Sequence, residues 1–182
     1  MTRHTTLCLM SLSAEDVQLV RRWRNDSPMA LRTSFPLTEA MQQEFYQTII
    51  CDQRAPHRYW AVTGRGDGVF YGMAGLAPIQ WENGCGEISL VINPEVRGHG
   101  IGAASLYVVL AEAFRVLRLE TVHGECYECN PAIDFWRSMV AEWRGTASTW
   151  VRRKFWQGRL WDSYLFAFTR EDFEAVMAGD GA

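Results

Sequence analysis

The sequence predicts a mixed α/β domain with a central, mostly antiparallel sheet of about seven strands flanked by helices. Three observations point to this class. The elements follow the order strand, two helices, three strands, helix, strand, helix, two strands. A glycine-rich loop joins a strand to a helix in the middle of the chain, as in a strand–helix–strand unit. The 182 residues contain no internal repeat or linker, so we expect one domain over 1–182, with its core in about 4–170 and a flexible tail at 178–182.

The N-terminal part is expected to form one strand and two helices. Residues 4–12 form the expected strand, and Ser13 followed by Asp16 is typical of a helix start. That helix should end near Asn25, because Pro28 disfavours a helical conformation in the residue before it. Thr38 is expected to cap a second helix. Each helix has an apolar stripe, with Val17, Val20 and Trp23 in the first and Met41, Phe45 and Ile49 in the second.

Three strands are expected next, over 59–63, 69–79 and 87–92. A glycine-rich turn at 64–68 joins the first two. The turn before the third strand contains Asn83-Gly84, a pair that tolerates the positive φ of a tight hairpin. A long helical pattern follows the third strand, with apolar residues at Leu106, Val109, Leu110, Ala113, Phe114 and Leu117.

The C-terminal part is expected to add a strand at 119–127 and a helix with Pro131 in its first turn. Residues 143–168 predict a long hairpin that turns near Gln157-Gly158. Thr169 and Asp172 are expected to cap a short last helix that ends at Gly179.

Composition and charge exclude several classes of protein. Hydrophobic residues make up 48% and charged residues 21%, which is typical of a globular chain. The net charge of −3 is unlike that of a general nucleic-acid binder. Apolar stretches such as Leu106–Ala111 are far shorter than a membrane span, so no membrane partner is expected. Residues 1–10 show no secretory signal, and we therefore expect a cytoplasmic protein.

The five cysteines are interpreted as reduced thiols of a cytoplasmic protein. Cys126 and Cys129 form a C-x-x-C pair, and His99 or His123 could be imagined as further zinc ligands. No second pair lies at the spacing of a zinc finger, so we expect no metal. A thioredoxin-like redox pair is disfavoured as well, because Pro131 follows the pair instead of lying within it.

The loop at 97–102, Arg-Gly-His-Gly-Ile-Gly, lies between a strand and a helix start. Glycines there let the backbone approach a ligand, and the free N–H groups with the helix dipole suit a pyrophosphate. A Walker A loop is excluded, because no Gly-Lys-Ser/Thr follows. A dinucleotide fingerprint is formally present in Gly98-x-Gly100-x-x-Ala103 with Glu120 downstream. It is disfavoured because four residues separate the strand from the first glycine, and because Glu120 falls at the start of its strand.

The third interpretation of this loop is coenzyme A binding. Here the sequence resembles the GCN5-related N-acetyltransferase (GNAT) family, whose loop reads Arg/Gln-x-x-Gly-x-Gly/Ala and is matched by Arg97, Gly100 and Gly102. The preceding strand and its Pro-containing lead-in, 87–95, are similar to the family's. The segment 130–136, Asn-Pro-Ala-Ile-Asp-Phe-Trp, resembles its Asn-x-Ala-Ile-x-Phe-Tyr helix start. The resemblance covers roughly 4–170 in element order and is specific at these motifs.

The resemblance implies acetyl-CoA as co-substrate and direct attack of an amine on its thioester. It implies that the amides of 98–102 hold the pyrophosphate and that β-strand residues run beside the pantetheine, where the family's strand bulges. The cofactor-binding residues so implied are Leu90, Val91, Ile92, Arg97, Gly98, His99, Gly100, Ile101, Gly102, Asn130 and Trp136.

Proton transfer needs a base, because a primary amine is mostly protonated at neutral pH. Glu87 is the first candidate, since it opens the strand that leads to the loop and similar family members place a carboxylate there. Glu125 and Glu128 are second choices. The family's usual tyrosine acid is replaced by Trp136, whose indole has no acidic proton. Tyr127, a water, or an unassisted thiolate would then complete the reaction.

The resemblance also implies an acceptor site shaped by the first two helices and the last hairpin. Its expected residues are Trp23, Arg24, Asn25, Phe35 and Trp81. Trp-Arg-Asn at 23–25 looks like the branch that acetylates nucleotide-linked amino sugars, and also like ribosomal-protein N-terminal acetyltransferases. A small-molecule amine is favoured over a protein N-terminus or lysine. A modified nucleobase, a homodimer, and a CoA-binding regulatory domain without catalysis stay open. The basic hairpin tip, Arg152 to Lys154 with Arg159, is interpreted as a solvated face that could attract a phosphorylated acceptor.

Overall fold

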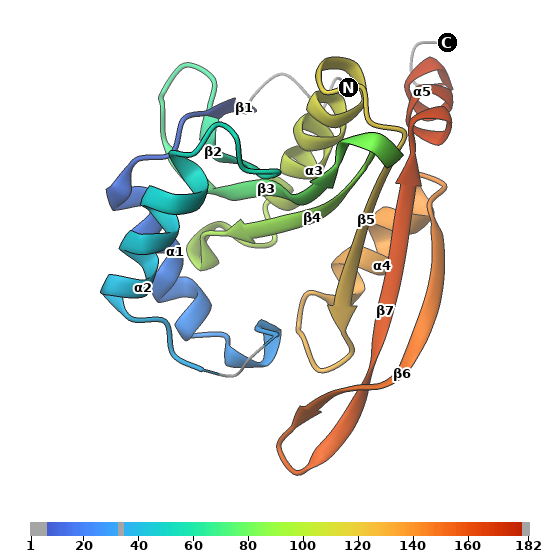
Figure 1. The fold of residues 1–182 in the computed structure, drawn as a ribbon. Coiled ribbons are helices and arrows are strands. Elements are labelled where there is room, and N and C mark those ends of the chain that lie inside the picture. Colours follow the sequence, from blue (N-terminus) through green and yellow to red (C-terminus); the bar gives the residue numbers. More distant parts are fainter. Residues whose placement is uncertain (1–6, 33–34, 180–182) are drawn as a thin grey trace.

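A computed structural model describes residues 7–32 and 35–179, and one seven-stranded sheet runs through it (Figure 1). The strand order is β1-β2-β3-β4-β5-β7-β6, and every neighbouring pair is antiparallel except β4 and β5. The strands are β1 (Leu7–Met10), β2 (Arg58–Gly64), β3 (Phe70–Gln80), β4 (Cys85–Ile92), β5 (Thr121–Tyr127), β6 (Thr146–Trp156) and β7 (Arg159–Thr169). The predicted fold class and strand number are confirmed.

Helices cover both faces of the sheet. They are α1 (Ala14–Asn25), α2 (Glu39–Phe45), α3 (Ile101–Ala111), α4 (Ile133–Glu142) and α5 (Arg170–Gly179). The main core lies between the sheet and the helices α3, α4 and α5. A smaller core lies on the opposite face, where Val17 and Val20 of α1 pack against Met73 of β3 (Figure 1). The crossover from β4 through α3 to β5 is the predicted strand–helix–strand unit.

The first two helices begin where their caps predict. Ser13 and Asp16 form a reciprocal capping box at α1, which ends at Asn25. The Thr38 hydroxyl accepts the Met41 amide at the start of α2. The predicted apolar stripe of the second helix is wrong at Met41, which is exposed, while its neighbour Gln42 is buried. The helix widens to a π-helix over Tyr46–Ile50, and this shifts which residues face the core.

The later elements agree with their predicted order but differ in detail. The hairpin turns at Gln157-Gly158, both with positive φ, and Thr169 bonds Asp172 at the start of α5. Pro131 was expected in the first turn of α4, but that helix begins at Ile133, after the cap residue Ala132.

Both expected chain ends extend beyond the described residues. Residues 178 and 179 belong to α5 and not to a tail, while 180–182 lie outside the described residues, as do 4–6 of the expected first strand. Within the described part of the chain, no helix is long and apolar enough to cross a membrane.

Two irregularities bend the sheet where functional residues were expected. The family-based bulge was expected within β4, but the extra residue lies on β3, where Ala77 and Pro78 face Glu87. On β6, two extra residues lie between Trp150 and Lys154, and the Arg152 amide donates to the Asp162 carboxylate at 2.7 Å. The second bulge turns the β6–β7 hairpin under the loop that follows α1.

Candidate active site

The parallel strands β4 and β5 separate shortly after they meet. They pair only at Cys85–Thr121, Gly86–Val122 and Glu87–His123. Beyond Glu87, the backbone groups of 88–92 that face β5 have no ladder partner there. Leu90, Val91 and Ile92 lie on this open edge, as expected for residues that run beside an extended ligand. The separation therefore exposes a row of backbone hydrogen-bonding groups in the middle of the sheet.

The glycine loop lies at the end of this open edge and begins α3. Gly98 and Gly100 have φ of 80° and 78°, a conformation that favours glycine. A Cβ at either position would meet no atom within 4 Å, so both flank open space. Gly100 caps α3 without a side chain, which leaves the first amides of the helix without intrahelical partners. This arrangement fits a pyrophosphate.

The other loop residues have more specific positions. A Cβ on Gly102 would lie 3.1 Å from the Phe135 ring, so this glycine lets α3 approach α4. The His99 ring is exposed, and its Nδ1 lies 3.0 Å from the Arg97 carbonyl oxygen. Ile101 opens α3 and packs partly against the main core. Arg97 is exposed at the front of the loop.

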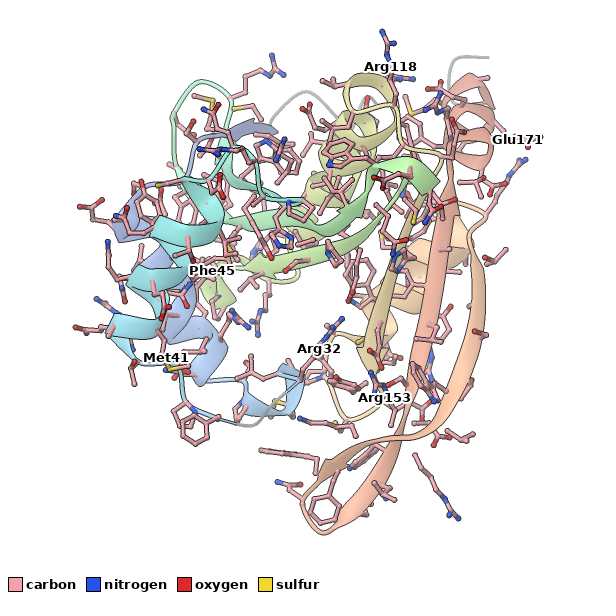
Figure 2. All side chains as sticks on the ribbon, viewed as in Figure 1. Arg32, Met41, Phe45, Arg118, Arg153 and Glu171 are labelled. Carbon is pink, nitrogen blue, oxygen red and sulfur yellow. The ribbon has the colours of Figure 1, made fainter. Side chains whose placement is uncertain are left out.

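Glu87 lies at the last paired position before the two strands separate. Alternation along β4 places it on the sheet face that α1 covers, because Val91 of the same strand packs in the smaller core there. Its carboxylate accepts a hydrogen bond from Arg32, and the pair forms a salt bridge. Glu87 is 21% exposed and Arg32 is 63% exposed. Figure 2 shows Arg32 reaching from the loop after α1 toward the space where β4 and β5 separate.

Tyr127 lies at the end of β5 on the same face and is buried. Burial raises the pKa of its phenol, and Glu125 raises it further. The Lys154 ammonium lies 5.4 Å from the centre of the Tyr127 ring and donates to the Leu31 carbonyl at 2.6 Å. Lys154 therefore connects β6 to the loop that carries Arg32.

The second-choice bases are both paired with arginines. The Arg153 Nε lies 3.1 Å from Glu125 and approaches from β6 (Figure 2). Arg137 lies 3.1 Å from Glu128, which is exposed at the end of β5. Glu125 belongs to the same face as Glu87, whereas Glu128 bonds toward α4.

Three expected acceptor residues lie at the end of α1. Trp23 stacks on Phe70 with ring centres 5.8 Å apart and belongs to the smaller core. Arg24 is half-buried, and burial lowers the pKa of its guanidinium. Asn25 donates to the Leu37 carbonyl at 2.9 Å and accepts the Leu37 amide at 2.8 Å. Both polar groups of Asn25 are thus occupied by the backbone of Leu37, and among these residues Arg24 is best placed for a ligand.

The remaining predicted residues are spread around this centre. Phe35 is 68% exposed on the loop after α1, and Trp81 is exposed under the Arg58 guanidinium at 5.5 Å, in the turn before β4. Asn130 accepts the Ala132 amide and shapes the start of α4. Trp136 is only 8% exposed and stacks on Phe166 at 4.5 Å, so most of its indole lies in the main core.

Sequence reasoning missed Arg32 and Tyr59 and assigned Lys154 to a solvated tip. Tyr59 lies in β2, where burial raises the pKa of its phenol and both Arg24 and Glu87 act on it electrostatically. Arg32 stands alone in an irregular loop, and no spacing rule identifies such a residue. Lys154 stands in a basic run in the sequence. The bulge in β6 turns its side chain inward, whereas its neighbours stay exposed.

A family model described as "Acetyltransferase (GNAT) domain" matches residues 6–134. This match covers the glycine loop, both strands that separate, and the start of α4. The chain belongs to the GNAT acetyltransferase family. It is accordingly an acetyl-CoA-dependent N-acetyltransferase, and the loop at 97–102 fits the pyrophosphate of that co-substrate.

Solved structures support the GNAT fold. Spermidine N-acetyltransferase from Vibrio cholerae, in complex with CoA and spermine, has a TM-score of 0.80 and 17% identity, over 92% of this chain and 98% of that one. Mutant forms of the spermidine/spermine N-acetyltransferase SpeG from the same organism have a TM-score of 0.78 and 19% identity, over 93% and 96%. A dodecameric form of that enzyme has a TM-score of 0.74 and 20% identity, over 92% and 95%. No match was found among curated proteins.

All five cysteines are free thiols. Burial raises the pKa of Cys126 to about 12, and Cys129 donates to the Met29 carbonyl. Over residues 7–32 and 35–179, no group of three or more histidine, cysteine or acidic side chains is arranged to hold a metal ion.

Proposed function

We propose that this enzyme acetylates the primary amine of a small molecule, with a nucleotide-linked amino sugar as the favoured acceptor. The observation that carries the proposal is the position of Glu87, at the point where β4 and β5 separate. The side chains around it come from α1, the following loop, β5 and β6. The resemblance of Trp-Arg-Asn at 23–25 to the amino-sugar branch supports this choice of acceptor.

Charge around Glu87 supports an acceptor with phosphate groups. Four cationic side chains lie on this side of the sheet: Arg24, Arg32, Arg153 and Lys154. Two carboxylates face them, Glu87 and Glu125, and each is already paired with an arginine. A free polyamine would meet like charge here, whereas a diphosphate would meet complementary charge. Spermidine and spermine, after which the structurally similar enzymes are named, are therefore not the acceptors we favour.

Glu87 is proposed as the base of the transfer. Acetyl-CoA supplies the acetyl group as a thioester. The acceptor ammonium loses a proton to Glu87, and its nitrogen then bonds to the acetyl carbon. The nitrogen releases its second surplus proton to water, and the carbon–sulfur bond breaks to leave a thiolate. The thiolate takes a proton from Tyr127 or water. The raised pKa of Tyr127 keeps its phenol protonated at neutral pH, as a proton donor requires.

Binding of acetyl-CoA is assigned to the open edge and the loop. The amides of Gly98, Gly100 and the first turn of α3 would hold the pyrophosphate. The free backbone of Leu90 to Ile92 would hold the pantetheine, with Asn130 and the exposed edge of Trp136 beside it. Arg97 and His99 would contact phosphate from the exposed side of the loop.

A CoA-binding regulatory domain without catalysis is the second candidate. Trp136 at the usual tyrosine position favours it, because the buried indole cannot donate a proton to the thiolate. Arg32 on Glu87 also leaves the base occupied in the unliganded protein.

Thiol release from acetyl-CoA with a panel of amines tests both candidates. The panel contains a nucleoside-diphosphate amino sugar, spermidine, a peptide with a free N-terminus and a peptide with one lysine. We expect the highest kcat/KM with the amino sugar nucleotide. Preference for spermidine or a peptide would overturn the proposed acceptor. Binding of acetyl-CoA in calorimetry with no thiol release from any amine would favour the regulatory domain.

A further inference from the structure

The proposed base is engaged by another side chain in the unliganded protein. Arg32 donates to the carboxylate of Glu87, and this hydrogen bond raises the pKa of the Arg32 guanidinium. A carboxylate held in this way has an oxygen engaged by the guanidinium, so that oxygen is not free to meet an incoming amine. The cation also repels an incoming ammonium group. An acceptor amine can use Glu87 only after Arg32 has moved away.

Arg32 is placed so that such a movement costs little. Its side chain is 63% exposed, and exposed ion pairs are weak in water. Its backbone is anchored, because the Lys154 ammonium donates to the carbonyls of Leu31 and Arg32. The backbone of Arg32 can therefore stay in place while the long side chain exchanges partners.

Arg24 is a second cation near Glu87, and it indicates where Arg32 would meet an anionic group of the acceptor. Arg24 is half-buried, and among the described residues its guanidinium has no carboxylate partner within salt-bridge distance. Its neighbour Tyr59 interacts electrostatically with Arg24, Glu87 and Arg32, so these four groups share one environment. Leaving a charged group half-buried without a counter-ion is unfavourable. An anion bound between Arg24 and Arg32 would remove this cost and draw Arg32 away from Glu87.

We propose that Arg32 is a specificity-determining residue that exchanges Glu87 for an anionic group of the acceptor and so frees the base. This rests on the proposed function. An acceptor with a phosphate or carboxylate near its amine binds Arg32 and Arg24 through that group, and its amine then meets an unpaired Glu87. An amine without an anionic group leaves Arg32 on Glu87 and is acetylated slowly.

The test compares two acceptors that differ in one group. The first is a nucleoside-diphosphate amino sugar, and the second is the methyl glycoside of the same amino sugar. Wild-type enzyme should prefer the first. Arg32→Gln should lower kcat/KM for the nucleotide-linked sugar and raise it for the glycoside, so that their ratio falls by about tenfold or more, as expected for loss of a charge-assisted hydrogen bond. Arg32→Lys should keep part of the preference.

Two further measurements separate this role from a merely structural one. Arg24→Gln should lower kcat/KM for the nucleotide-linked sugar alone. Arg22→Gln, an exposed arginine of α1, is the matched control and should leave the ratio unchanged.

The outcomes also distinguish this inference from the proposed function. If wild-type enzyme acetylates neither acceptor, the proposed function fails. If it acetylates both equally well, or if Arg32→Gln lowers both by one factor, the exchange is overturned and acetyl transfer stands. A pair of β-alanine and its amide tells carboxylate from phosphate as the recognised anion. Acetyl-CoA affinity by calorimetry must match wild type in every variant.

Discussion

Three glycines of the cofactor loop have two different roles. Gly98 and Gly100 adopt positive φ beside open space, so they leave room for a ligand. Gly102 is packed against Phe135 and leaves room for a helix. All three stand in one motif, and the sequence pattern does not tell them apart. We therefore expect substitution of Gly100 to affect ligand binding and substitution of Gly102 to affect stability.

Gly100→Asp is expected to abolish acetyl-CoA binding. A Cβ there strains the backbone at a φ of 78°, and the carboxylate repels the pyrophosphate. Calorimetry with acetyl-CoA measures this directly. Gly102→Ala is the control, and we expect it to lower thermal stability while acetyl-CoA still binds. Wild-type affinity in Gly100→Asp would contradict the assignment of this loop.

Cys126 is expected to resist alkylation while Cys51 reacts. Burial raises the Cys126 pKa to about 12, so its thiol stays neutral near pH 8, and the thiolate is the reactive form. Cys51 is exposed at the end of the π-helix. Iodoacetamide labelling of the native protein, followed by peptide mass spectrometry, gives the order. Labelling of Cys126 before Cys51 would show that the Cys126 thiol is open to solvent.

At the scale of the elements, the β6–β7 hairpin supports the loop after α1. The bulge at 151–153 turns Lys154 inward, and its ammonium donates to Leu31 while the exposed residues around it face outward. Asn25, at the end of α1, binds the backbone of Leu37 before α2. The position of Arg32 therefore depends on contacts between segments more than a hundred residues apart in sequence.

Lys154→Met should weaken acceptor binding more than acetyl-CoA binding. The substitution keeps most of the side-chain length but removes the donor to Leu31, and we expect about 1–3 kcal/mol of lost stability from the unpaired carbonyl. Acceptor KM should rise while the acetyl-CoA Kd stays near wild type. The control is Arg152→Met in the same bulge, where the backbone amide makes the contact to Asp162. An unchanged acceptor KM would show that the loop is held by other contacts.

The starts of the helices could be predicted where they depend only on residues close in sequence. Ser13, Thr38 and Thr169 each cap the helix that their side chains predicted, because capping depends on neighbours only. Met41 and Pro131 were misplaced, since the side of α2 that packs inward and the start of α4 both depend on tertiary packing. Arg32 and Lys154 were missed as site residues for the same reason. Their partners lie far away in sequence, and only the fold brings them together.

At the scale of the whole molecule, the site arises from one parallel pair in an antiparallel sheet. β4 and β5 are joined by a crossover through α3, pair over three positions and then separate. The glycine loop predicted this unit, because a strand, a loop and a helix must return to the sheet. The sequence did not predict that the extra residue lies on β3, opposite Glu87. Chain order thus indicated where we propose that the co-substrate binds, and the bulge on β3 lies opposite the proposed base.

The central claim is that Glu87 removes the proton from the acceptor amine at this separation. Its most direct test is kcat/KM for the acceptor in Glu87→Gln, which keeps the shape of the side chain and removes the proton acceptor. The account predicts a fall of roughly 10²-fold or more with the acetyl-CoA Kd nearly unchanged, while Glu82→Gln in the exposed turn before β4 stays at wild type. Activity of Glu87→Gln within about twofold of wild type, held across the pH range where a carboxylate would titrate, would contradict the claim and place the base elsewhere.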